Sequence, residues 1–210
     1  MQDKIIKIIK LLEKDYDLTF YSRKKPFKVL ISVILSQRTR DENTLIASKK
    51  LFSKFDTPKK LANADISEVK KLIKQSGFYN IKAKRIKEVS RILLNKYNGK
   101  VPHKLDKLLE LPGVGRKTAN CVLVYGFNIP AIPADTHVHR ISNRIGIVKT
   151  KTPEQTEHEL MKKVPKKYWI NINELFVKHG QTICNPIKPK CDKCSISELC
   201  DFSKNLPKDI

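Results

Sequence analysis

Apolar residues recur along this chain at the three- and four-residue spacing of helices. The clearest stripe lies near the N-terminus and consists of Ile5, Ile6, Ile8, Ile9 and Leu12. Such spacing places the apolar side chains on one face, which predicts an amphipathic helix. The β-branched segment FKVLISVIL at 27–35 has no partner strand and no hairpin turn nearby, so we expect a buried helix there. The whole pattern predicts an all-α fold of many short helices.

Capping and breaking residues indicate where several helices begin and end. Asp65 precedes Glu68 by three positions, which is a capping-box-like start, and Gly77 is expected to stop the segment that follows. We expect Asn80 to cap the next helix, which ends at the Asn-Gly pair 98–99.

Two prolines interrupt the helical pattern at PAIPA, residues 130–134, and we place a soft domain boundary there. Beyond this break, the stretch TPEQ puts Thr152 at an N-cap, Pro153 at the first helical position and Gln155 where a capping box needs it. The C-terminal segment with four cysteines forms a distinct small unit.

Charge changes this picture more than composition does. The chain has 43 Lys and Arg against 21 Asp and Glu, a formal charge of +22. This favours a polyanionic partner, although a lysine-rich solvated surface is the alternative.

No apolar run approaches the roughly 20 residues of a membrane span, and charges interrupt the N-terminal apolar stretch, so we expect a cytoplasmic protein. No heptad pattern predicts oligomerisation, and we expect a monomer.

The stretch ELPGVGRKTAN, residues 110–120, predicts an anion-binding turn. KLDKLLEL at 104–111 predicts a short helix, PGVG a tight turn, and the next segment a second helix that stops at Gly126. The N–H groups and dipole of a helix start attract an anion, and glycine allows phosphate to approach the backbone. The spacing is not that of a nucleotide-binding P-loop, so DNA phosphate fits better. A plain connection between helices is the alternative.

Three motifs in this order carry a resemblance to a known family. LPGVGRKTAN, then DTHVHRISNRIG from Asp135, then four C-terminal cysteines resemble the endonuclease III family of helix–hairpin–helix DNA glycosylases, over residues 27–202. The resemblance implies two helical lobes with a DNA-binding cleft between them. One is a six-helix barrel domain, residues 20–130, containing the helix–hairpin–helix at 104–125. The other is an iron–sulfur cluster domain, residues 1–19 and 131–210, with its cluster loop at 184–200.

The resemblance also implies an activity in base excision repair. A bifunctional enzyme of this family removes damaged pyrimidines from double-stranded DNA and then nicks the abasic strand. Three rivals stay open: a mismatch or uracil glycosylase of the same fold, a lyase directed mainly at abasic sites, and a non-enzymatic iron–sulfur DNA-binding protein.

Two residues are expected to carry the chemistry. Lys117 follows the hairpin, where the positive end of the helix and Arg116 should lower its pKa and favour the neutral, nucleophilic amine. The resemblance implies that Lys117 attacks C1′ and forms a Schiff base. It also implies that Asp135, an expected cap for the helix from Thr136, stabilises positive charge as the base leaves. The alternatives are that Lys117 only binds phosphate and that Asp135 only caps.

The four C-terminal cysteines, spaced C-x6-C-x2-C-x5-C, are Cys184, Cys191, Cys194 and Cys200. A disulfide framework is unfavourable in a reducing compartment, and four thiolates in 17 residues indicate a metal. The spacing is similar to that of the [4Fe–4S] site in the endonuclease III family, with zinc or degraded iron as the alternatives. The implied role is structural. The lysines of this loop either face DNA phosphates or are merely solvated.

Further residues are expected to contact DNA, because a buried base must be turned out and its gap filled. Matching the family's inserting positions gives Gln37 or Arg38 in one loop and Phe78 in another, with core packing as the alternative for Phe78. The other expected contacts are Lys82 and Arg85 to phosphate, Gly113, Gly115 and Arg116 in the hairpin, and His137 to the substrate strand.

Overall fold

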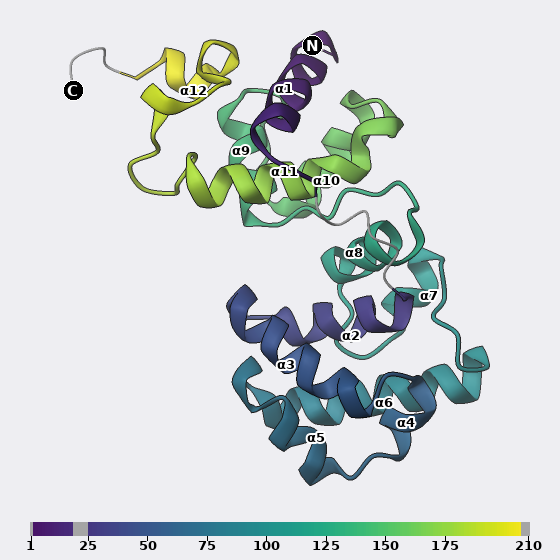
Figure 1. The fold of residues 1–210 in the computed structure, drawn as a ribbon. Coiled ribbons are helices and arrows are strands. Elements are labelled where there is room, and N and C mark those ends of the chain that lie inside the picture. Colours follow the sequence, from purple (N-terminus) through teal and green to yellow (C-terminus); the bar gives the residue numbers. More distant parts are fainter. Residues whose placement is uncertain (1, 19–24, 207–210) are drawn as a thin grey trace. The chain divides into compact units, whose positions relative to one another are not determined.

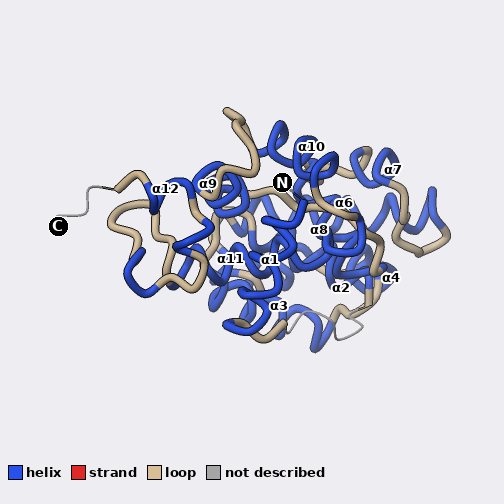
Figure 2. Tube along the Cα trace, turned by 90° about the horizontal axis from the view of Figure 1, so that it is seen from above, coloured by secondary structure: helices blue, strands red, loops and turns tan. Residues whose placement is uncertain are grey.

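The computed structural model describes residues 2–18 and 25–206, and these are helical with no strand among them (Figures 1 and 2). The all-α prediction is therefore confirmed. The chain divides into two compact units, one of Arg23–Asn128 and one of Met1–Ser22 with Ile129–Ile210. No helix within the described ranges has the length and apolar character needed to cross a membrane.

The first unit is built around one central helix. Its elements are α2 (Pro26–Ser36), α3 (Asp41–Lys54), α4 (Pro58–Asn63), α5 (Ile66–Leu72), the 3-10 turn η1 (Lys74–Ser76), α6 (Tyr79–Tyr97), α7 (Leu105–Leu109) and α8 (Arg116–Phe127). The buried helix predicted at 27–35 is α2, which packs against α8, α3 and α6. Its apolar residues face several directions, because neighbours surround it on several sides.

The second unit joins the two ends of the chain. Its elements are α1 (Gln2–Asp15), α9 (Thr136–Arg144), α10 (Pro153–Lys163), η2 (Lys166–Tyr168), α11 (Trp169–Thr182), η3 (Cys191–Lys193), η4 (Ser197–Leu199) and α12 (Asp201–Lys204). The predicted N-terminal stripe packs α1 against α11 (Figure 1), with Ile5, Ile8, Ile9 and Leu12 buried and Ile6 half-buried. These residues share a core with Val138, Leu175 and Phe176.

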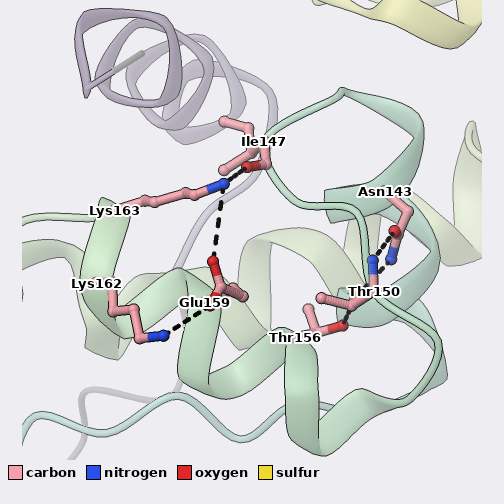
Figure 3. Close-up of polar contacts among 7 residues, drawn as sticks. All are labelled: Asn143, Ile147, Thr150, Thr156, Glu159, Lys162 and Lys163. Atoms are coloured by element: carbon pink, nitrogen blue, oxygen red, sulfur yellow. Dashed lines mark hydrogen bonds and ion pairs between the residues drawn. The ribbon is translucent and has the colours of Figure 1, made fainter.

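Polar side chains fix the connection between α9 and α10 (Figure 3). Asn143 accepts from the Thr150 N–H at 2.8 Å, and the Thr150 hydroxyl contacts that of Thr156 at 2.6 Å. At the other end of the connection, Lys163 donates to the Ile147 carbonyl at 2.9 Å and lies 3.9 Å from Glu159. These bonds hold α9 in place, which matters because α9 carries several residues of the candidate site.

Local capping predictions have mixed outcomes. Asp65 and Thr152 cap α5 and α10 as expected, the former accepting from Ser67 and Glu68 and the latter from Gln155. The Asn80 prediction is wrong, because α6 starts at Tyr79 after Phe78 in a left-handed conformation. Gly126 does not stop α8, which runs to Phe127.

Gly126 has a packing role instead. A Cβ at Gly126 would lie 3.2 Å from the Pro26 Cα, which is closer than side-chain carbons normally approach backbone. The glycine therefore lets α8 approach the start of α2.

Candidate functional site

The hairpin between α7 and α8 presents Lys117 to solvent. Lys117 is exposed in the first turn of α8, and Arg116 before it is half-buried. The N-cap residue, Gly115, has no side chain to cap the helix, and a Cβ built on it would meet open space. The backbone at this helix start is therefore open to an anion as large as phosphate.

Gly113 plays a different part in the same turn. Its φ of 75° lies in the left-handed region, and a Cβ there would overlap the Arg85 side chain. The Gly113 carbonyl accepts from Gln37 Nε2 at 2.8 Å, and Arg85 donates to Gln37 Oε1 at 3.3 Å. Arg85, expected to contact phosphate, thus packs over the hairpin and ties it to Gln37.

The structure separates the two candidate inserting residues of the first loop. Gln37 is held against the hairpin by the bonds just described. Arg38 is exposed and has a φ of 52°, a conformation that a residue with a large side chain adopts only when its surroundings hold it there. Of the pair, Arg38 is the one presented outward.

Phe78 in the second loop has the same two properties. Its side chain is 59% exposed, and its φ is 47°. The alternative that Phe78 packs in the core is therefore not what the structure shows. An exposed aromatic ring held on a strained loop is suited to stacking against a base.

Lys82 is not placed as expected. It is only 3% exposed, and its ammonium donates to the carbonyls of Leu35 and Ser76, each at 2.6 Å, and to the Thr39 hydroxyl at 2.7 Å. Burial, with a smaller effect of Arg85, lowers the pKa of Lys82 to about 8, so it stays an ammonium at neutral pH. All three of its donors are engaged inside the protein, so the prediction that Lys82 binds phosphate is wrong.

Asp135 and His137 belong to the other unit. Asp135 Oδ1 accepts from the N–H groups of His137 and Val138, each at 3.0 Å, which confirms the expected N-cap of α9. Its other oxygen makes no hydrogen bond within residues 2–18 and 25–206. Asp135 thus caps with one oxygen and leaves the other for a different partner.

Helix α11 packs against His137 at Gly180, and Arg140 links the two. Arg140 Nη2 lies 3.1 Å from His137 Nδ1, and since a guanidinium only donates, this contact favours an unprotonated Nδ1. Arg140 also donates to the carbonyls of Gly180 and Cys184, at 3.1 and 2.8 Å. A Cβ on Gly180 would overlap His137, so only glycine allows this packing.

The four C-terminal cysteines line one small pocket of about 20 Å³. All four are free thiols, and burial raises the pKa of Cys194 to about 11. Thiolates in such a place need a compensating positive charge, which a metal supplies. Within the described part of the chain, no three His, Cys, Asp or Glu side chains converge on the position of a single metal ion. The donor set, four thiols around one pocket, fits an iron–sulfur cluster, whose usual ligands are thiolates.

Two residues that sequence reasoning missed surround this pocket. Arg144 donates to Cys184 Sγ at 3.3 Å and to the Asn185 carbonyl at 2.7 Å, and its guanidinium lies 4.7 Å from the Phe202 ring centre. His179 is buried, with Nε2 3.6 Å from Cys194 Sγ. For Arg144, the available signal in the sequence was its spacing from Arg140, one helical turn earlier on the helix that Asp135 caps.

Comparison with known proteins gives a consistent result. Residues 31–166 match the family described as HhH-GPD superfamily base excision DNA repair protein. Over 183 residues the chain is 56% identical to Endonuclease III of Thermotoga maritima, covering 87% of this chain and 86% of that protein. The fold is similar to a trapped endonuclease III–DNA covalent intermediate, with a TM-score of 0.87, 34% identity and 97% of each chain covered. It is also similar to a thermostable thymine-DNA glycosylase, with a TM-score of 0.84, 28% identity and coverage of 97% of this chain and 98% of that one.

Proposed function

Because this chain belongs to the endonuclease III family of HhH-GPD base excision DNA repair proteins, we propose that Lys117 and Asp135 carry out its chemistry. The chain is a DNA glycosylase and abasic-site lyase that acts on damaged duplex DNA. The observation that carries the assignment is the exposed Lys117 in the first turn of α8, directly behind a glycine turn open to phosphate.

Lys117 is the nucleophile in this proposal. Its amine attacks C1′ of the damaged nucleotide, the glycosidic bond breaks, and the base leaves with the bonding electrons and takes up a proton. The sugar ring opens to a Schiff base with Lys117. Removal of a C2′ proton then expels the 3′ phosphate, which breaks the strand. The related trapped covalent intermediate supports a covalent route of this kind.

Asp135 acts as the electrostatic partner. A carboxylate whose second oxygen is left over from capping is suited to stabilising the positive charge that develops on the sugar. His137, which Arg140 contacts through Nδ1, is the proposed contact to the substrate strand on this side.

The hairpin and the two loops hold the DNA. Gly113, Gly115 and Arg116 place the backbone of the hairpin against phosphate, which positions DNA without reading its sequence. Arg38 and Phe78 fill the gap left by the everted base. The substrates proposed are oxidised or otherwise damaged pyrimidines.

The proposed cofactor is a [4Fe–4S] cluster, and its ligands would be the thiolates of Cys184, Cys191, Cys194 and Cys200. The cluster would cross-link a segment that consists of short turns. Arg144 and His179 orient the thiols and exclude water from the pocket. Purified protein should be yellow-brown and contain about four iron and four sulfide per chain, whereas stoichiometric zinc in active protein would contradict the assignment.

Borohydride trapping tests the proposed chemistry directly. Duplexes containing thymine glycol, uracil, a G·T mismatch or an abasic site are incubated with protein and reductant. A covalent adduct with thymine glycol supports the proposal, and adducts with uracil or G·T instead would indicate a mismatch or uracil glycosylase. An adduct with the abasic site alone would indicate a lyase, and no adduct would indicate a binding protein.

Two substitutions assign the roles. Lys117→Ala should abolish the adduct and lower strand cleavage by about 10³-fold or more. Asp135→Asn keeps a capping oxygen but loses the charge, and should lower base release by about 10²-fold. The matched control is Asp65→Asn, which changes a cap of the same geometry on α5 and should leave catalysis unaltered. Full activity of Lys117→Ala would refute the proposal.

A further inference from the structure

We propose that Lys82 is a positioning residue that joins the two inserting loops and fixes the direction of Arg38 and Phe78. The two loops are residues 36–40 and 76–78. This inference rests on the proposed function, because it concerns residues that enter DNA there. It assigns to Lys82 a role in turning out the damaged base rather than in bond breaking.

The hydrogen bonds of Lys82 reach both loops at once. Leu35 and Thr39 lie on either side of Arg38 in the chain, and Ser76 lies two residues before Phe78. The Thr39 hydroxyl in addition donates to the Ser76 carbonyl, so the two loops also contact each other directly. One buried ammonium therefore connects the Leu35 carbonyl before Arg38 and the Thr39 hydroxyl after it to the Ser76 carbonyl, which leads into Phe78.

Helix α6 supplies the anchor for this contact. The Lys82 N–H donates to the Phe78 carbonyl at 3.1 Å, which is the first turn of α6. The Lys82 side chain then turns back toward the loops from the same helix. Lys82 is thus fixed to Phe78 through the backbone and to the Arg38 loop through its side chain.

The chemistry of the contact indicates more than core filling. An ammonium has three donors, and Lys82 has three neutral oxygen acceptors, so the group is fully satisfied without a carboxylate. Burying a charge among neutral partners is unfavourable compared with an apolar side chain of similar length. The three bonds fix the direction of the side chain, and the residues next to them, Arg38 and Phe78, are exposed and have strained backbones.

The test compares Lys82→Met with Lys87→Met in the full chain. Lys87 lies on the same helix and is also buried, with its ammonium donating to the Ala64 carbonyl, away from the inserting loops. Both variants lose a buried ammonium and keep a long apolar side chain. Only Lys82→Met removes the ammonium that links the loops, and the direct bond from Thr39 to Ser76 is left in both variants.

Base eversion is the direct readout. Stopped-flow fluorescence of 2-aminopurine beside thymine glycol follows opening of the duplex. Lys82→Met should slow eversion and excision from duplex DNA by about 10- to 100-fold, since misplacing a positioning group by about 1 Å has effects of this size. Cleavage of an abasic site in single-stranded DNA needs no eversion and should change by less than about threefold. Lys87→Met should match wild type in both assays.

A purely structural role predicts a different pattern. If Lys82→Met lowers duplex and single-strand activity equally, or everts the base as fast as Lys87→Met, the inference is wrong.

If Lys82→Met does not fold, Thr39→Val replaces it, because this isosteric change removes one hydroxyl from the same contact and should slow eversion several-fold. Thr39→Val with wild-type eversion would equally overturn the inference. Failure of the proposed function would instead appear as wild-type protein that traps no DNA.

Discussion

Among the described residues, two kinds of non-glycine residue adopt a left-handed backbone near helix ends in the unit Arg23–Asn128. Asn98 and Asn128 do so at the C-terminal caps of α6 and α8, where asparagine tolerates this conformation. Arg38 and Phe78 do so with large, exposed side chains. Strain of this second kind persists where it serves a function, which agrees with their proposed insertion into DNA.

The substitution Arg38→Asn separates stability from activity. Asparagine adopts positive φ more readily than arginine, so the free energy of unfolding should rise by about 0.5 kcal/mol. Excision from duplex DNA should fall by about tenfold, because the short side chain no longer fills the gap. Chemical denaturation and single-turnover excision measure the two effects. A variant that is less stable and fully active would contradict both expectations.

Sequence reasoning succeeded for residues whose role depends on near neighbours. Asp135 was expected to cap α9 because its partners lie two and three positions ahead. It failed for Lys82, whose acceptors lie up to 47 positions away and turn the side chain inward. It left Gln37 and Arg38 as alternatives, because the bond from Gln37 to Gly113 spans 76 positions and is invisible in the local pattern.

The same distinction holds at the scale of elements. Helices such as α2 and α10 were predictable because apolar spacing and caps are properties of a short segment. The extent of α8 was not, because Gly126 appeared to be a stop signal while its actual partner is Pro26 at the start of α2. The cap expected at Asn80 was also missed, because α6 starts at Tyr79 after Phe78 in a left-handed conformation.

Exposed ion pairs link α7, the first helix of the hairpin, to α6, and their shared carboxyl is that of Glu110. Glu110 contacts Lys107 at 2.8 Å and also contacts Lys96, and these hydrogen bonds lower the pKa of Glu110 to about 2. A carboxyl with a lowered pKa in the folded state stabilises the fold above its ordinary pKa of 4.5, and this contribution is lost as the pH falls toward 2.

Glu110→Gln should therefore lower the melting temperature at pH 7 by about 1 to 2 °C, as is usual for solvent-exposed pairs. The difference from wild type should narrow at pH 3.5, because the carboxyl is then mostly protonated in the unfolded state and must lose a proton on folding. It should also narrow in 1 M salt, because screening weakens the pairs. Paired thermal melts at the two pH values measure it. A difference that stays constant with pH would show that Glu110 acts through packing.

At the scale of the whole molecule, the two units depend on different sources of stability. The unit Arg23–Asn128 is organised around the buried α2. In the other unit, α1, α9 and α11 share an apolar core, yet the segment after α11 consists mainly of short turns. Ile196 is buried there, but few other apolar side chains are. Order in that segment should therefore depend on what the four cysteines bind.

Removing the proposed cluster tests this dependence. Oxidative loss of iron, followed by chelation and desalting, should lower the unfolding midpoint of the second unit by about 10 °C or more, since a ligand that binds only the folded state stabilises it. Hydrogen exchange should speed up in residues 184–204 and hardly change in α2 and α8. Arg144→Leu, which removes the bond to Cys184 Sγ, should accelerate iron loss without altering α2. Unchanged exchange at 184–204 after iron removal would mean that the polypeptide alone holds this segment, and that the cysteines serve another purpose.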